Sequence, residues 1–231
     1  MVVKGILLAF CMIYALTARA EIAQIADIPA DLVTSAISGV AAADGVDALY
    51  AACPADYYAS HKSWWRGLIR GDKSVSFEFC KKNFDRCTSL CLTESDAKAC
   101  VNLGRILENR KEDGARAASR KAHALSCAFG RAGGCTNRGG GLRNRTVPGD
   151  PMQSATVDLK ACLFRSFDQA CSEGDSWGCA MSGQTYQLGE GVAADPARAK
   201  RLYQRACDLA SSPKFASCSF AQSRLNALAQ E

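Results

Sequence analysis

The stretch Gly178–Asp208, GCAMSGQTYQLGEGVAADPARAKRLYQRACD, predicts two helices joined by a turn. The first helix is rich in small residues, among them Gly183, and it stops at the glycine-rich turn Gly189–Val192. Asp195 followed by Pro196 is typical of a helix N-cap with proline at the first helical position. The second helix carries an apolar stripe of Leu202, Tyr203 and Ala206. Because two such helices cannot bury their apolar faces alone, the pair needs neighbours of the same kind.

Four cysteine pairs recur along the chain at a nearly constant distance. Their first members lie 36, 44 and 36 residues apart. A supersecondary unit of about 35 to 45 residues that returns several times is typical of a solenoid. The pairs are Cys91 with Cys100, Cys127 with Cys135, Cys171 with Cys179, and Cys207 with Cys218.

Geometry indicates what each pair does. If Cys171 and Cys179 lay on one continuous helix, a rise of roughly 1.5 Å per residue would hold them about 12 Å apart. A disulfide needs Cα atoms within roughly 7 Å, so a chain reversal must separate its two cysteines. Glycine, serine and proline residues supply one between the members of these pairs. We therefore expect disulfides across tight corners between helices, the alternative being reduced thiols buried at helix ends.

The amino terminus favours the oxidised state. Lys4, the apolar run Gly5–Leu16 and the small-residue pattern Ala18–Ala20 together are typical of a secretory signal. We expect residues 1–20 to be removed after Ala20, which leaves no stable membrane anchor and predicts a secreted or periplasmic protein. Cleavage removes Cys11 from the 13 cysteines, so an even number remains for an oxidising compartment. The bulky Phe10 argues against acylation of Cys11.

Charge points to no nucleic-acid partner. The chain holds 28 Lys and Arg against 23 Asp and Glu, and the basic residues are scattered among acidic ones. One stretch is denser in positive charge and could form a binding loop for an anionic partner, although a plain polar loop fits it as well. Its members are Arg138, Arg143 and Arg145.

The stretch Gly178–Asp208 resembles the Sel1-like repeat, and more narrowly its cysteine-rich, Hcp beta-lactamase-like branch. The match covers a whole repeat: a small-residue helix closed by Gly-x-Gly-Val, an Asp-capped helix ending in Ala-Cys-Asp, and Cys218 near the start of the next unit. In another unit His123 takes the place of Tyr203. The resemblance implies an all-α protein, a right-handed α/α solenoid of TPR-like helix-turn-helix repeats stapled by disulfides.

On this basis we divide the chain into three parts. The signal peptide is followed by an N-terminal helical segment or cap at residues 21–48 and by a repeat solenoid at residues 49–231. Within the solenoid the expected units are about 63–98, 99–133, 134–177 and 178–217, with a C-terminal capping helix at 218–231.

Four cysteines stay outside the repeating pattern: Cys53, Cys80, Cys87 and Cys162. Cys80 and Cys87 lie seven residues apart on one predicted helix, too far to bridge each other. We expect Cys53 to pair with Cys80 or Cys87, and Cys162 to be free or to pair with the remainder.

Few residues suggest catalysis. His61 and His123 lie in no metal-binding motif, so neither a metal nor another cofactor is expected. Ser211 and Lys214 fit the S-x-x-K spacing of penicillin-binding enzymes, but no S-D-N or K-T-G follows. These two residues are the only catalytic candidates, and we favour no catalytic site.

The sequence thus predicts a scaffold that binds a protein, a peptide or a cell-wall fragment on the concave face of the solenoid. The resemblance also leaves a weak beta-lactam or amide hydrolase, or a penicillin-binding protein, as an alternative. A second alternative is an assembly factor for an envelope or redox complex, similar to a mitochondrial intermembrane-space member of the same branch. The predicted secretory signal argues against a location in the mitochondrial intermembrane space.

Overall fold

A computed structural model describes residues 25, 27–59, 75–154 and 158–230, and all structural statements refer to these. The predicted signal peptide with its cleavage point after Ala20, His61 and the beginning of the first predicted repeat lie outside them. The described residues form helices and no strand. No helix in this part of the chain combines the length and hydropathy needed to cross a membrane.

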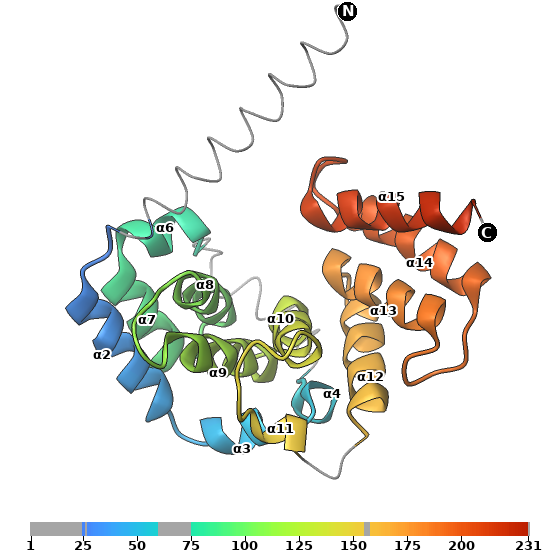
Figure 1. The fold of residues 1–231 in the computed structure, drawn as a ribbon. Coiled ribbons are helices and arrows are strands. Elements are labelled where there is room, and N and C mark those ends of the chain that lie inside the picture. The colour runs from blue at the N-terminus through green and yellow to red at the C-terminus, as the bar shows by residue number, and fades with distance from the viewer. Residues whose placement is uncertain (1–24, 26, 60–74, 155–157, 231) are drawn as a thin grey trace, which may run out of the picture.

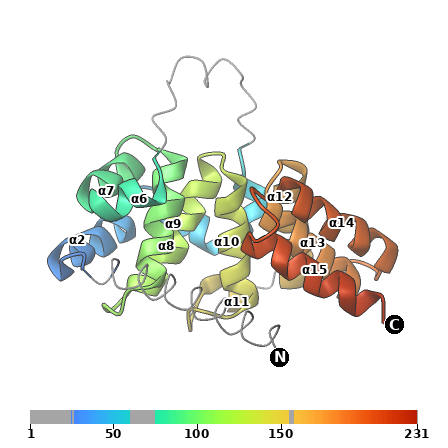
Figure 2. The same ribbon diagram turned by 90° about the horizontal axis from the view of Figure 1, so that it is seen from above.

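The helices follow one another in an arc (Figures 1 and 2). The N-terminal part contains α2 (Ala30–Ala41), α3 (Val46–Ala51), α4 (Pro54–Tyr57), α6 (Phe77–Lys82) and α7 (Phe84–Leu92). The middle contains α8 (Ala97–Glu108), α9 (Ala115–Ala128), α10 (Ala132–Arg143) and α11 (Pro151–Ser154). The C-terminal part contains α12 (Leu159–Ser172), α13 (Ser176–Leu188), α14 (Pro196–Leu209) and α15 (Ala216–Leu228).

Consecutive helices pack against each other from α7 to α10 and from α12 to α15, and α10 packs against α12. The N-terminal helices lie across this row, since α2 and α3 contact α9 while α4 contacts α12. Aspartate side chains begin four of the helices by accepting hydrogen bonds from backbone N–H groups. These caps are Asp96, Asp158, Asp175 and Asp195. The cap predicted at Asp195 with Pro196 behind it is confirmed.

The same kind of contact joins three helix pairs, in which an aromatic ring of one helix lies against a glycine of an earlier helix in the row. His123 packs on Gly104, Phe167 on Gly139 and Tyr203 on Gly183, where an added Cβ would come within 2.6–2.8 Å of the ring. A side chain larger than hydrogen would therefore push the helices apart. At Gly183, one of the small residues noted in the sequence, the ring of Tyr203 occupies the space that a side chain would fill.

Disulfides close the corners between helices as the spacing predicts. The four pairs join α7 to α8, α9 to α10, α12 to α13 and α14 to α15, with Cα–Cα distances of 4.3–4.7 Å. In chain order, Cys91 bonds to Cys100, Cys127 to Cys135, Cys171 to Cys179, and Cys207 to Cys218.

The predicted pairing of the other four cysteines was wrong. Cys80 bonds to Cys87, with Cα atoms 5.1 Å apart, because the expected single helix breaks at Asn83 (φ −130°, ψ 58°). The kink between α6 and α7 brings the two cysteines within bonding distance. Cys53 bonds to Cys162, which lies 109 residues away, so neither of these two is free.

Candidate functional site

A groove of about 460 Å³ opens between the middle and the C-terminal part of the helix row. Five helices contribute to it, namely α8, α9, α10, α13 and α15. Its walls carry polar, charged and aromatic side chains from segments more than 100 residues apart in the sequence. The residues used below are Glu108, Arg120, Asn137, Gly140, Gly141, Arg143, Asn144, Trp177, Met181, Gln184 and Phe220.

Helix α10 forms the floor of the groove and is unusually rich in glycine. Its five glycines lower its helix propensity, since each costs roughly 1 kcal/mol relative to alanine. Close neighbours account for most of them: a Cβ at Gly139 would meet Phe167, and one at Gly141 would lie 2.5 Å from Cδ of Arg120. Gly140 differs, because a Cβ there meets nothing within 4 Å in the described part of the chain. The backbone of Gly140 is therefore not covered by other described residues on the side that faces the groove.

Two asparagines stand on either side of this bare position. Asn137 and Asn144 are seven residues apart on α10 and its C-cap, which is two helical turns or about 10.5 Å. Asn144 is exposed and Asn137 is half-buried, and their side-chain amides form no hydrogen bond with another described residue. Each amide can donate and accept one hydrogen bond at the same time.

Two arginines line the groove. Arg120, only 4% exposed, forms an ion pair with Glu108 and donates from Nη1 to the backbone oxygen of Asn137 at 3.2 Å. Its Nε–H has no hydrogen-bond partner in the described structure. Arg143 donates to Oε1 of Gln184 at 2.7 Å and pairs with Glu190, while burial lowers its pKa.

The opposite wall is apolar. The rings of Trp177 and Phe220 lie 5.8 Å apart, and Met181 lines the groove beside them. The guanidinium of Arg224 lies 5.1 Å from the centre of the Phe220 ring. Arg224 forms no ion pair with a described residue, so it adds an uncompensated positive charge to this side of the groove.

This arrangement is suited to binding. The hydroxyl of Thr136 in the lining donates to Oδ1 of Asp175 at 2.8 Å, and that oxygen also caps α13 by accepting from the N–H of Gly178. His123 is fully buried under α8, and burial together with nearby arginines lowers its pKa to about 3, so it stays neutral. Among the described residues no three His, Cys, Asp or Glu side chains gather as a metal site. The exposed turn between α14 and α15 holds Ser211 and Lys214, and neither residue is among those that line the groove.

The three arginines predicted as a binding loop are separated by the structure. Arg138 is fully buried, where it bonds to both carboxylate oxygens of Asp150 at 2.5 and 2.8 Å and to the backbone oxygen of Tyr50. Arg138 therefore links α10 to Asp150 and Tyr50 inside the protein and is not a ligand-binding residue. Arg143 lines the groove, and Arg145 lies in the turn after α10 beside a separate small recess.

The corner cysteines support the groove without lining it. Cys100 lies in the first turn of α8 and Cys135 in the first turn of α10, and both side chains are buried. Their disulfides fix the starts of the two helices, whose later residues Glu108, Asn137 and Asn144 face the groove. Cys100 and Cys135 are therefore structural residues and not ligand-binding ones.

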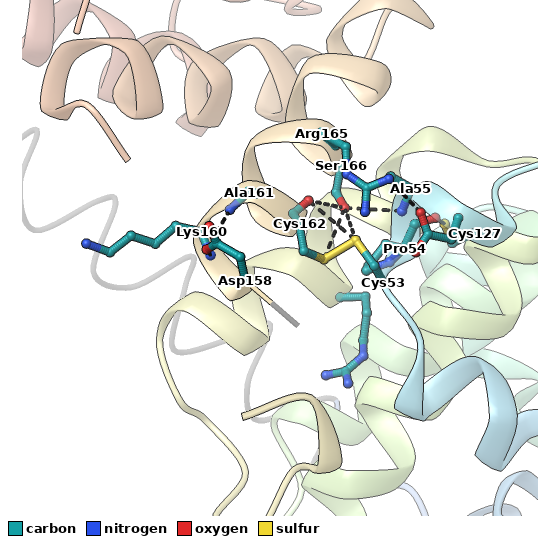
Figure 3. Close-up of a disulfide and its surroundings, with 12 residues drawn as sticks. Cys53, Pro54, Ala55, Cys127, Asp158, Lys160, Ala161, Cys162, Arg165 and Ser166 are labelled. Atoms are coloured by element: carbon teal, nitrogen blue, oxygen red, sulfur yellow. Dashed lines mark hydrogen bonds and ion pairs between the residues drawn. A yellow bond between two sulfur atoms is a disulfide. The ribbon is translucent and has the colours of Figure 1, made fainter. Parts of the chain in front are cut away.

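The long-range disulfide lies beside the groove-forming helices and fixes the N-terminal segment to α12 (Figure 3). Cys53 and Cys162 are both almost fully buried, and Ser166 bridges them by donating to the carbonyl of Cys162 at 2.9 Å and accepting from the N–H of Ala55 at 3.2 Å. On the surface Arg165 pairs with Asp56 at 2.6 Å. These contacts hold α4 against α12.

Sequence reasoning missed most of the groove. Trp177 belongs to the predicted unit 134–177 and Phe220 to the predicted capping helix 218–231, so no local pattern joins these two residues of the aromatic wall. One signal was present in the sequence: the run Gly139–Gly141 lies near the start of the predicted helix-turn-helix unit 134–177, and glycine inside a helix needs a packing or functional reason.

Comparison with known proteins gives two related matches. Over 156 residues the chain is 32% identical to cytochrome c oxidase assembly factor 7 of Xenopus tropicalis. Over the same length it is 30% identical to cytochrome c oxidase assembly factor 7A of Xenopus laevis. The aligned part is 68% of this chain and 57% of each relative, so the chain spans little more than half their length. No known family profile and no solved structure matches the chain.

Proposed function

We propose that this protein is an assembly factor for a redox complex of a membrane, and specifically for cytochrome c oxidase. The observation that carries the proposal is the similarity over 156 residues to two proteins named as cytochrome c oxidase assembly factors. It favours the second alternative from the sequence over a secreted scaffold or a β-lactam hydrolase.

The groove suggests how such a factor acts. Its unpaired amides, aromatic wall and arginines suit the binding of a polypeptide. The protein would hold a subunit or another factor during assembly without changing it chemically.

The fold supports the finer architecture proposed from the sequence. The repeated contact of an aromatic ring on a glycine, together with disulfides at alternate corners of the helix row, is consistent with a right-handed solenoid of Sel1-like repeats. In this reading the groove lies on the concave face, where the partner would bind.

The disulfides suggest the compartment. All twelve cysteines of the described residues are paired, which requires an oxidising environment. We place the protein on the oxidising side of the membrane that holds the oxidase, which is the periplasm in bacteria and the intermembrane space in mitochondria.

The test is removal of the protein from its native cells, followed by native gel analysis and activity assay of the respiratory complexes. We expect loss of assembled cytochrome c oxidase with the other complexes preserved. The wild-type chain should restore it, and Gly140→Leu, which fills the groove, should not. The matched control Gln204→Leu changes an exposed residue of α14 outside the groove. Normal oxidase levels in cells without the protein would refute the proposal.

A further inference from the structure

We propose that the groove binds an extended polypeptide segment that carries an apolar side chain beside acidic residues. This inference rests on the proposed function only in taking the groove as the partner site. It adds the conformation and the chemistry of the segment that is bound.

Helix α10, the floor of the groove, exposes its backbone at Gly140. Gly140 has helical geometry, and a Cβ there would meet open space, so neither backbone strain nor packing requires glycine. Glycine elsewhere is used where another backbone must come very close. The bare peptide surface at Gly140 therefore fits direct contact with the main chain of a ligand.

The spacing of the two asparagines matches a short extended segment of a bound polypeptide. Asn137 and Asn144 stand about 10.5 Å apart with Gly140 between them. Three residues of extended chain span roughly 10 Å, so the two amides can each pair with a peptide group of one extended segment.

The opposite wall selects the side chain. A residue pointing away from α10 would contact the rings of Trp177 and Phe220 and the thioether of Met181. Such a surface favours leucine, methionine or an aromatic residue, because these bury the largest apolar area.

The charge of the groove determines which residues are favoured beside the apolar side chain of the bound segment. Arg120 and Arg143 line the groove, but each is paired with a carboxylate, Glu108 and Glu190 respectively, so the excess charge comes from Arg224, which has no ion-pair partner among the described residues. The excess is positive, so carboxylates next to the apolar side chain are favoured and lysines are disfavoured.

The test uses the oxidised full-length chain on an immobilised array of nine-residue peptides with a central Leu-x-Phe flanked by Glu, Gln or Lys. Binding should be strongest for the Glu set, weaker for Gln and at background for Lys. Arg224→Gln should lower binding of the Glu set about threefold and leave the Gln set unchanged. Equal binding of all three sets, binding of none, or a dimer of the chain that blocks the groove would each overturn the inference.

Gly140→Ala separates a ligand-contacting glycine from a structural one. We expect the melting temperature to rise by about 2–4 °C, because alanine is the better helix former, while binding of the Glu set falls about tenfold. The control Gln204→Ala on α14 should leave binding unchanged. A lower melting temperature, or undiminished binding, would show that Gly140 has no such role.

The peptide array and the oxidase assembly assay can give different outcomes, so they test the two proposals separately. If the array shows no preference while oxidase assembly still needs the groove, this inference falls and the proposed function stands. If acidic peptides bind as expected while oxidase assembly is normal without the protein, the binding chemistry holds and the proposed function falls.

Discussion

His123→Phe should make the protein less sensitive to acid. The imidazole is fully buried against Gly104, and neither ring nitrogen has a hydrogen-bond partner in the described structure. Phe167 and Tyr203 fill the equivalent places in the two later helix pairs, so an aromatic ring without nitrogens fits this site.

The size of the effect follows from proton binding. Burial, followed by the charges of nearby arginines, lowers the pKa of His123 from 6.5 to about 3 in the folded protein. The unfolded chain binds a proton below about pH 6.5 and the folded one does not, so stability falls as the pH falls through this window. At about 1.36 kcal/mol per pH unit, acidification to pH 4.5 costs the wild type roughly 2–3 kcal/mol through this residue alone.

Urea unfolding of the oxidised wild-type and His123→Phe proteins at pH 7.5, 6.0, 5.0 and 4.5 measures this. Both proteins share all carboxylates, so the difference between their free energies of unfolding isolates the histidine. It should be nearly constant above pH 6.5 and grow in favour of the variant below it. A difference that stays constant down to pH 4.5 would show that the imidazole is not buried as a neutral group.

Three further outcomes are expected, each measured by urea unfolding. The double variant Cys53→Ser with Cys162→Ser should lose about 5 kcal/mol, because its disulfide closes a loop of 109 residues; a loss below that of a corner disulfide, about 2.5 kcal/mol, would contradict the chain-entropy argument. Arg138→Met should cost about 3–5 kcal/mol by leaving a buried carboxylate unpaired, and Asp150→Leu in the same chain should recover most of it; no recovery would mean that the ion pair is not the cause. Gly104→Ala should destabilise by about 1–3 kcal/mol, since its methyl group would overlap the imidazole; unchanged stability would disprove that close contact.

The local corners could be predicted from the sequence because each depends on a short segment. Cys171 and Cys179 lie eight residues apart, and only a chain reversal lets them bond, as the structure has it. The cap at Asp195 is equally local, since the side chain reaches an N–H three residues ahead. The same reasoning failed at Cys80 and Cys87, because the break at Asn83 leaves no glycine or proline signal in the sequence.

The sequence by itself therefore determined the helical class, the corner disulfides and the regular spacing of the cysteine pairs, all of which arise within about 40 residues of chain. Only the tertiary structure decided that Cys53 meets Cys162, that Arg138 pairs with Asp150 inside the protein, and that α10, α13 and α15 together line a groove. The physical reason is that these features depend on how whole helices pack across the row. Side-chain contacts between residues 40 to 110 positions apart set that packing, and no periodicity in the sequence records them.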